Sequence, residues 1–132
     1  MRNEELRKLD AALAEALGYE VGPMDDFVEG TTLAISGRGI TLRRLPHYSI
    51  DPVAMLELDR EMRERGYCVN VECLPPLYCA EYWKLDTDGN GMELVAAKHH
   101  KKETVARALA AHRALTGREW TDGRSAKGSK QD

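Results

Sequence analysis

Five consecutive residues carry, or can carry, a positive charge where the last helix of the chain is expected to begin: Lys98, His99, His100, Lys101 and Lys102. Cations oppose the positive end of a helix dipole, which normally attracts acids. The free N–H groups at a helix start bind anions, and neighbouring lysines would add charge attraction. The pattern predicts an anion site. The alternative is that the helix begins one turn later and the lysines are simply solvated.

A second candidate is the run Asp86-Thr87-Asp88-Gly89-Asn90-Gly91, which matches the first half of a calcium loop. Oxygen ligands stand at alternate positions and glycine is sixth, but the twelfth position is Ala97 where a bidentate Glu should close the shell. Asp, Asn and Gly also suit a tight turn because they tolerate positive φ. We therefore predict a hairpin turn here and no bound calcium.

The chain has three cysteines, Cys68, Cys73 and Cys79, and they form no Cys-x-x-Cys pair. The strong zinc signature is therefore missing. Strand alternation also places Cys73 on the opposite sheet face from the other two, which breaks up a cluster. We predict buried, reduced thiols that behave as small hydrophobic residues, with no disulfide and no zinc. The histidines that could still join a metal site are His47, His99 and His100.

Two carboxylates, Glu72 and Glu81, are expected on one sheet face with Asn70 and Trp83. Paired carboxylates beside an aromatic ring could perform acid–base chemistry or glycoside hydrolysis. No nucleophile–base constellation, phosphate-cradling glycine loop or His-x-x-x-His pair accompanies them in the sequence. The pattern favours a partly solvated face, so we assign no catalytic residue and expect no cofactor.

Three helices are expected to position these residues, and their ends are marked by capping signals. The first begins at Asn3 and stops at Gly18, and the third runs from about residue 101 to residue 116. The second begins with Asp51 as cap and Pro52 in the first turn. On this second helix we expect the following side chains to face water: Asp59, Arg60, Glu61 and Arg63.

Strand patterns fill the intervals between the helices. A short strand at 19–21 precedes a hairpin of 31–36 with 39–45, whose turn at 37–38 would place Ile35 opposite Ile40 and Leu33 opposite Leu42. A second hairpin joins 67–74 to 77–85 with Leu74 facing Leu77, and another strand covers 92–97. This second hairpin has one core face, predicted to carry Tyr67, Val69, Val71, Cys73, Tyr78, Ala80 and Tyr82.

Composition limits the function classes. The chain has 132 residues and a net charge of −3, which suits one domain and argues against a protein devoted to the nucleic-acid backbone. We expect a single domain over 1–120, a mobile acidic loop at 23–30 and a disordered polar tail over 121–132. No apolar run is long enough to span a bilayer and no targeting segment opens the chain, so a cytoplasmic protein is expected.

The order of elements favours an α+β fold with a mainly antiparallel sheet packed between helices, an α/β/α sandwich. On four features the chain resembles the phage ABA sandwich domain, a small domain of phage and prophage proteins. Those features are structural: the run at 48–51 before a helix, the Gly66-Tyr67 break, the strand end at 81–83 and the Ala-rich helix at 104–115. The resemblance therefore implies a phage accessory protein in a bacterial cytoplasm, and no reaction.

Two function classes follow. The first is a non-enzymatic phage accessory or host-interaction protein that binds an unknown host or phage protein. The second is a binder of nucleotide or nucleic-acid phosphate through residues 98–102, helped by basic residues of the tail. Neither involves a membrane, and the sequence leaves homo-oligomerisation open.

Overall fold

The structure is a computed structural model that describes residues 2–23, 33–36, 42–86, 88–121 and 124–125. The larger elements are three helices, α1 (Asn3–Ala16), α2 (Pro52–Glu64) and α3 (Glu103–Thr116), and an antiparallel sheet in the order β4 (Tyr67–Leu74), β5 (Leu77–Leu85), β6 (Met92–His100). The smaller strands are β1 (Glu20–Pro23), β2 (Leu33–Ser36), β3 (Leu42–Arg44), β7 (Trp120–Thr121) and β8 (Arg124–Ser125).

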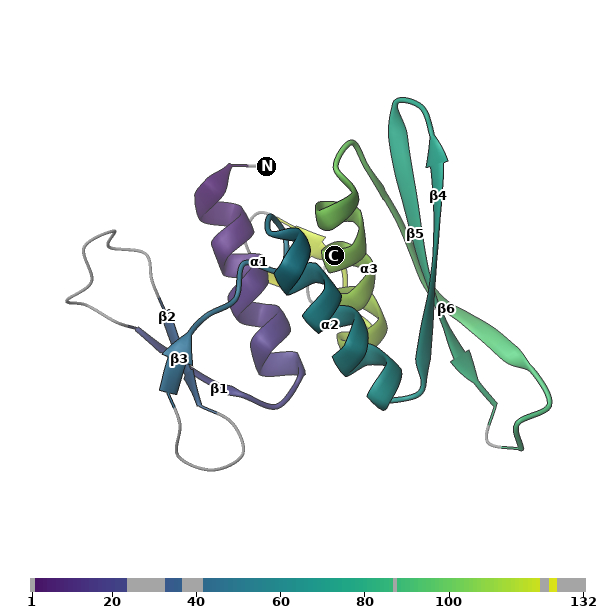
Figure 1. Ribbon diagram of the computed structural model, residues 1–132, viewed down its shortest axis with the longest axis horizontal. Helices are drawn as coiled ribbons and strands as arrows, with labels where there is room; N and C mark the ends of the chain where they lie inside the picture. The colour runs from purple at the N-terminus through teal and green to yellow at the C-terminus, as the bar shows by residue number, and fades with distance from the viewer. Residues whose placement is uncertain (1, 24–32, 37–41, 87, 122–123, 126–132) are drawn as a thin grey trace, which may run out of the picture.

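The predicted α+β class with a mainly antiparallel sheet is confirmed. Helix α3 contacts β5 and β6, and α2 contacts β4. In Figure 1 the helices lie beside the β4–β5–β6 sheet, and β1–β3 form a separate small sheet beyond α1. No helix in the described ranges is both long and apolar enough to cross a membrane.

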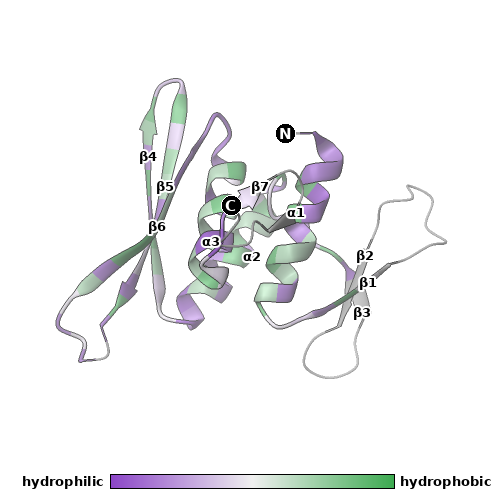
Figure 2. Cartoon of the chain, turned by 180° about the vertical axis from the view of Figure 1, so that it is seen from behind, coloured by the Kyte–Doolittle hydropathy of each residue, from purple (hydrophilic) through white to green (hydrophobic). Residues whose placement is uncertain are grey.

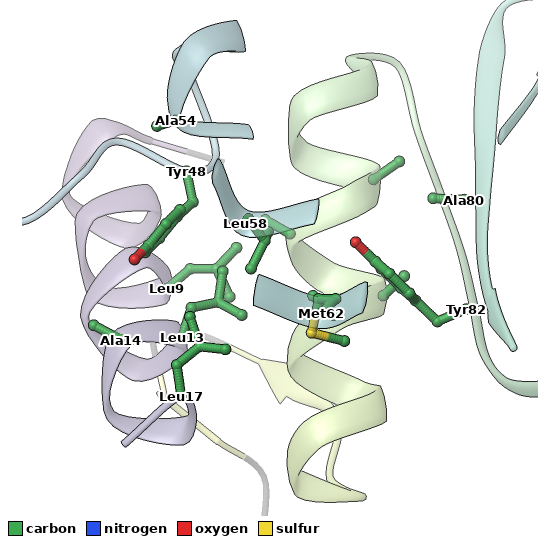
Figure 3. Packing of buried hydrophobic residues seen from close by; sticks show 14 of the residues in the cluster. Leu9, Leu13, Ala14, Leu17, Tyr48, Ala54, Leu58, Met62, Ala80 and Tyr82 are labelled. Atoms are coloured by element: carbon green, nitrogen blue, oxygen red, sulfur yellow. The ribbon is translucent and has the colours of Figure 1, made fainter. Parts of the chain in front are cut away.

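The core lies between the helices and the near face of the β4–β5–β6 sheet. Leu9 and Leu13 of α1 meet Leu58 and Met62 of α2, and Tyr82 of β5 closes the layer from the sheet side (Figure 3). All five side chains are fully buried. The predicted apolar stripes of α1 and α2 are therefore the faces that fold the chain, because burial of such side chains is the main favourable term.

The predicted cap of α2 and the glycines after α2 and α3 act as expected, whereas the N-cap of α1 is Arg2 and not Asn3, which lies inside the helix. Asp51 accepts a hydrogen bond from the backbone N–H of Val53 at 3.0 Å, and Pro52 opens α2. Gly66 follows the C-terminus of α2 at a φ of 91°, and Gly117 ends α3 at a φ of 73°. Both glycines adopt left-handed backbone that side-chain-bearing residues rarely accept.

A buried ion pair within α1 is hydrogen-bonded to the segment before α2, and no sequence pattern predicts it. The Arg7 guanidinium donates to the Asp10 carboxylate at 3.0 Å and to the Leu45 carbonyl at 2.9 Å. The second Asp10 oxygen accepts from the backbone N–H of Ser49 at 2.9 Å. Asp10 and Ser49 have no exposed surface, so this network satisfies polar groups that would be costly to bury alone.

The second hairpin has the predicted register. Leu74 pairs with Leu77, and the ladder continues to Tyr67 opposite Lys84. Beyond the prediction, the β5–β6 ladder changes register between Tyr82 and Trp83, because Val95 is an extra residue on β6. Such a bulge re-aims the side chains that follow it.

Other boundaries differ from the predictions. In the first hairpin Ser36, not Leu33, lies opposite Leu42, and Leu33 instead pairs with Pro23 of β1. The predicted partner Ile40 and the turn at 37–38 lie outside the described residues. Register there depends on a third strand, β1, which local turn chemistry does not reveal.

The boundary between β6 and α3 also lies later in the sequence than predicted. Strand β6 continues to His100, and α3 begins at Glu103. The strand is extended because Tyr78 and Ala80 of β5 pair with His100 and Lys98. This non-local pairing overrides the weak strand preference of lysine.

The predicted loop at 23–30 lies outside the described residues except for Pro23, which belongs to β1. In the predicted tail, Thr121 pairs with Arg124 in the β7–β8 ladder, and residues 122–123 and 126–132 are outside the described ranges. The disordered tail stays a prediction.

Candidate functional site

The predicted basic cluster is divided between two faces of the sheet and a turn. Lys98 and His100 occupy alternate positions of β6, so they share the face that carries Ala80 and Tyr78, while His99 lies on the other face opposite Cys79. Lys101 and Lys102 follow in the turn before α3 and are exposed. Because neighbouring strand residues point to opposite faces, the five side chains do not converge on one point.

Lys98 is already paired. Its Nζ forms an ion pair with the Glu119 carboxylate, and the Arg113 guanidinium lies 3.6 Å from the same group. The hydrogen bond from Lys98, together with the nearby Lys98 and Arg113 charges, lowers the pKa of Glu119 despite some burial. Lys98 therefore contributes less free positive charge than the sequence pattern implies.

The start of α3 contains its own acid. Glu103 stands in the first turn, where the helix dipole favours it, and accepts from Arg107 at 3.0 Å. The backbone N–H of Lys102 donates to His100 Nδ1 at 3.0 Å. Burial and the adjacent Lys102 and Lys101 charges lower the pKa of His100, so its ring is neutral at pH 7. The cations that remain free at this helix start are those of Lys101 and Lys102.

The calcium-like run is a turn between β5 and β6. The backbone N–H of Asp86 donates to the Gly91 carbonyl at 2.9 Å, and Asp88 accepts the N–H of Asn90 at 3.0 Å. Gly89 has a φ of 75°, which explains a glycine at this position. Within the described ranges no group of three or more His, Cys, Asp or Glu residues is arranged to hold a metal ion.

The sheet face turned away from the helices, called the outer face below, carries the other candidate residues (Figure 1). The ladders place Glu72, Cys79 and His99 in one row across β4, β5 and β6. Cys73 lies on the opposite face, as predicted. The outer face consists of the alternate residues 68–74 of β4 and 77–85 of β5, with Met92, Leu94, Ala97 and His99 of β6.

The row contains a cysteine beside a histidine, but its electrostatics do not activate the thiol. Burial, and then the Glu81 and Glu72 charges, raise the pKa of Cys79. A catalytic cysteine needs the opposite, a lowered pKa beside positive charge. The prediction that all three cysteines are buried is wrong, since Cys68 and Cys73 are exposed; all three are free thiols.

Glu81 is held in place at the centre of the outer face. One carboxylate oxygen accepts from the Asn70 amide and from the Trp83 indole N–H, both at 3.3 Å. Asn70 lies directly opposite Glu81 in the ladder, so the three polar groups form one cross-strand cluster. The arrangement positions a carboxylate for an incoming donor.

The outer face also has an apolar part that strand alternation alone does not reveal. Three cross-strand pairs lie on it, Leu74 with Leu77, Trp83 with Leu94, and Leu85 with Met92. Four of these side chains are strongly exposed: Leu74 at 51%, Leu85 at 50%, Met92 at 45% and Leu94 at 44%. Figure 2 shows hydrophobic segments along these strands where they extend past the helices. Strand alternation gave the faces of the hairpin but not the bulge that aims Leu94 and Met92 outward.

A depression of about 350 Å³ lies beside the end of α1, and polar side chains that line it are paired with one another. Glu61, predicted to face water, is 7% exposed and accepts from the Tyr19 hydroxyl at 2.6 Å and from Arg65 at 3.2 Å. Arg65 also donates to the Leu17 carbonyl. Helical periodicity predicts Glu61 on the solvent-exposed side of α2, because periodicity takes no account of hydrogen-bond partners from the adjoining segment.

Comparisons with known proteins identify a similar fold but no family. No protein-family model matches the chain, and no curated protein does. The structure is similar to the crystal structure of a phage protein from Bacillus cereus ATCC 14579, with a TM-score of 0.54 over 86% of this chain and 92% of that chain. The two sequences are 20% identical, so the likeness is one of fold.

Proposed function

We propose that the chain is a non-enzymatic phage accessory protein that acts by binding a protein partner through the outer face, in the cytoplasm of a bacterial host. The observation that carries the proposal is the exposure of Leu74, Leu85, Met92 and Leu94 on one sheet face. Three of these side chains, Leu85, Met92 and Leu94, are neighbours across β5 and β6, and contiguous apolar side chains open to solvent are typical of interaction sites. The fold shared with a Bacillus cereus phage protein supports the phage assignment, as does the resemblance to the phage ABA sandwich domain.

A macromolecular partner suits this surface better than a small molecule. Small ligands are bound in concave sites that enclose most of their surface. The outer face, with apolar side chains near both ends and polar groups between them, offers contact area but no concave site that would enclose a small ligand. Protein interfaces combine aromatic and apolar anchors with polar groups that form hydrogen bonds.

The second candidate is a phosphate-bearing ligand, nucleotide or nucleic acid, bound at the predicted cluster of Lys98, His99, His100, Lys101 and Lys102. The exposed Lys101 and Lys102 beside the start of α3 favour this function. Pairing of Lys98 with Glu119 and the neutral state of His100 weigh against it. We therefore rank it second.

Site-specific photo-crosslinking distinguishes the two functions. A photoreactive amino acid replaces Leu94 on the outer face, Lys101 at the start of α3, or the exposed Lys8 of α1 as the control, in chains expressed in bacteria. We expect nuclease-resistant adducts at position 94 well above those at position 8. Nuclease-sensitive adducts confined to position 101 would establish the second function. Equal labelling at positions 94 and 8 would refute the proposed one.

A further inference from the structure

The charges of the outer face have one sign. Glu72 and Glu81 lie near its centre, and among the described residues of this face there is no lysine or arginine. His99, the remaining titratable side chain with a basic ring, stands beside Cys79 at the edge strand. Lys84 and Glu93, by contrast, pair with each other on the opposite face. The centre of the outer face is therefore acidic at neutral pH.

Apolar side chains flank this acidic centre along the strands. Leu74 and Leu77 lie at the end near the 74–77 connection, and Trp83, Leu85 and Leu94 lie toward the other end. Without the bulge at Val95, Leu94 would point to the helices. The bulge turns it outward while Val95 itself packs against the core. The structure thus exposes apolar groups on both sides of two carboxylates.

From this arrangement we infer that the outer face binds an amphipathic protein segment that presents lysine or arginine to Glu72 and Glu81 between apolar side chains. The inference rests on the proposed function and specifies the chemistry of the partner. Apolar contacts on both sides exclude water from the centre, where a charge-assisted hydrogen bond to an oriented carboxylate is stronger than in solvent. The Asn70 and Trp83 donors leave the second oxygen of Glu81 for the partner.

The negative charge of the outer face also argues against three other binding partners: a second copy of the chain, a nucleic acid and an anionic membrane. A two-fold, face-to-face contact with a second copy of the chain would bring the carboxylates of both copies together, and like charges across an interface are costly. Nucleic acids and anionic membranes are repelled by the same two groups. A basic segment is the class of occupant that the two carboxylates attract.

The test uses amphipathic helical peptides as probes and the full-length chain as the target. One peptide carries lysines between leucines on a single helical face, and two matched peptides carry glutamine or glutamate in place of these lysines. Amide chemical shifts locate binding, and titration gives the Kd. We expect the lysine peptide to shift resonances of β4, β5 and β6 on the outer face, and to bind more tightly than both matched peptides.

Variants then separate local from overall charge. Glu72→Gln/Glu81→Gln should weaken binding of the lysine peptide by about tenfold, while Glu15→Gln/Glu64→Gln, two exposed acids on α1 and α2, makes the same change in net charge and should have little effect. Analytical ultracentrifugation of the free chain should give a monomer.

The outcomes are distinguishable. If the glutamine and lysine peptides bind the outer face equally, or if both double variants weaken binding equally, the charge inference fails and the proposed function stands. If the free chain is a dimer that Leu94→Glu dissociates, a second copy is the occupant and the inference fails. If the lysine peptide shifts residues outside the outer face alone, both the inference and the proposed surface fail.

Discussion

At the scale of single residues, the structure depends on polar groups that sequence patterns treat as surface. Arg7 and Asp10 flank an apolar stripe on α1, and nothing in the sequence distinguishes them from solvated charges. Their burial follows from the Leu45–Ile50 segment, which lies across α1 and supplies two carbonyls and the Ser49 N–H. Such partners are distant in sequence, so periodicity alone could not predict them.

Replacing Asp10 with Ala should destabilise the fold by about 3–5 kcal/mol, because the change leaves Arg7 without its carboxylate and Ser49 N–H without an acceptor. Urea denaturation measures this difference. Lys8→Ala, on the exposed side of the same helix, should change stability by less than about 0.5 kcal/mol. Equal effects of the two substitutions would show that the buried network is unimportant.

His112 should make stability depend on pH. Its ring is buried against Trp120, with the centroids 5.3 Å apart. Burial lowers its pKa from 6.5, assisted by the Arg118 and Lys98 charges and opposed by Glu119. The unfolded chain therefore takes up the proton at a higher pH than the folded chain. The stabilisation from the neutral ring is complete above about pH 6.5 and is lost as the pH falls from there through the lower folded pKa.

Melting temperatures measured from about pH 7 to about pH 5, the range in which histidine titrates, test this effect. The parent should lose stability across the range, and His112→Gln should show a shallower slope. Some slope should remain because the pKa of His100 is also lowered. An unchanged slope in His112→Gln would assign the pH dependence to other groups.

At the scale of secondary-structure elements, local sequence signals predicted the elements correctly. The pairing of strands that are distant in sequence could not be predicted from them. Helices α1 and α2 were predicted because apolar periodicity and a terminal glycine agree in each, and in α2 the cap at Asp51 agrees as well. The β4–β5 hairpin was predicted because Pro75-Pro76 leaves few registers for two alternating strands. The β2–β3 register and the end of β6 depend on β1 and β5, whose pairings no local pattern encodes.

The cap of α2 gives a direct test at this scale. Asp51→Ala removes the side-chain acceptor of the Val53 N–H and should cost about 1 kcal/mol. Asp51→Ser keeps an acceptor and should cost much less. Urea midpoints of the two variants should therefore differ. If they coincide, the cap contributes little and α2 is held by its buried face alone.

The start of α3 tests the second candidate function. If Lys101 and Lys102 bind phosphate, added phosphate should raise the Tm above that in chloride or sulfate at matched ionic strength. Lys101→Glu/Lys102→Glu should abolish this difference. The free variant should also be slightly more stable, because acids favour a helix N-terminus. Equal stabilisation of parent and variant by phosphate would exclude this site.

At the scale of the whole molecule, large apolar side chains of the described residues are exposed in two places, so two surfaces compete as the binding site. One is the outer face. The other is the exposed side of α2 and the turn that precedes it, where Ile50, Val53 and Leu56 are 45%, 73% and 60% exposed. Neither exposed surface is predictable from the sequence, because the exposure of a side chain depends on which other parts of the fold cover it. The outer face is favoured because it adds oriented carboxylates and an indole to its apolar groups.

Matched double variants decide between the two surfaces. Leu85→Glu/Leu94→Glu should abolish formation of the partner complex, because the change adds two more negative charges where apolar contact is needed. Val53→Glu/Leu56→Glu changes net charge equally and should leave the complex intact. All four side chains are at least 44% exposed, so each variant should fold with a Tm near that of the parent. Complex formation can be followed with the partner that crosslinks at position 94. Loss of the complex in the α2 variant alone would move the site to α2, and loss in both would indicate an interface that spans the two surfaces.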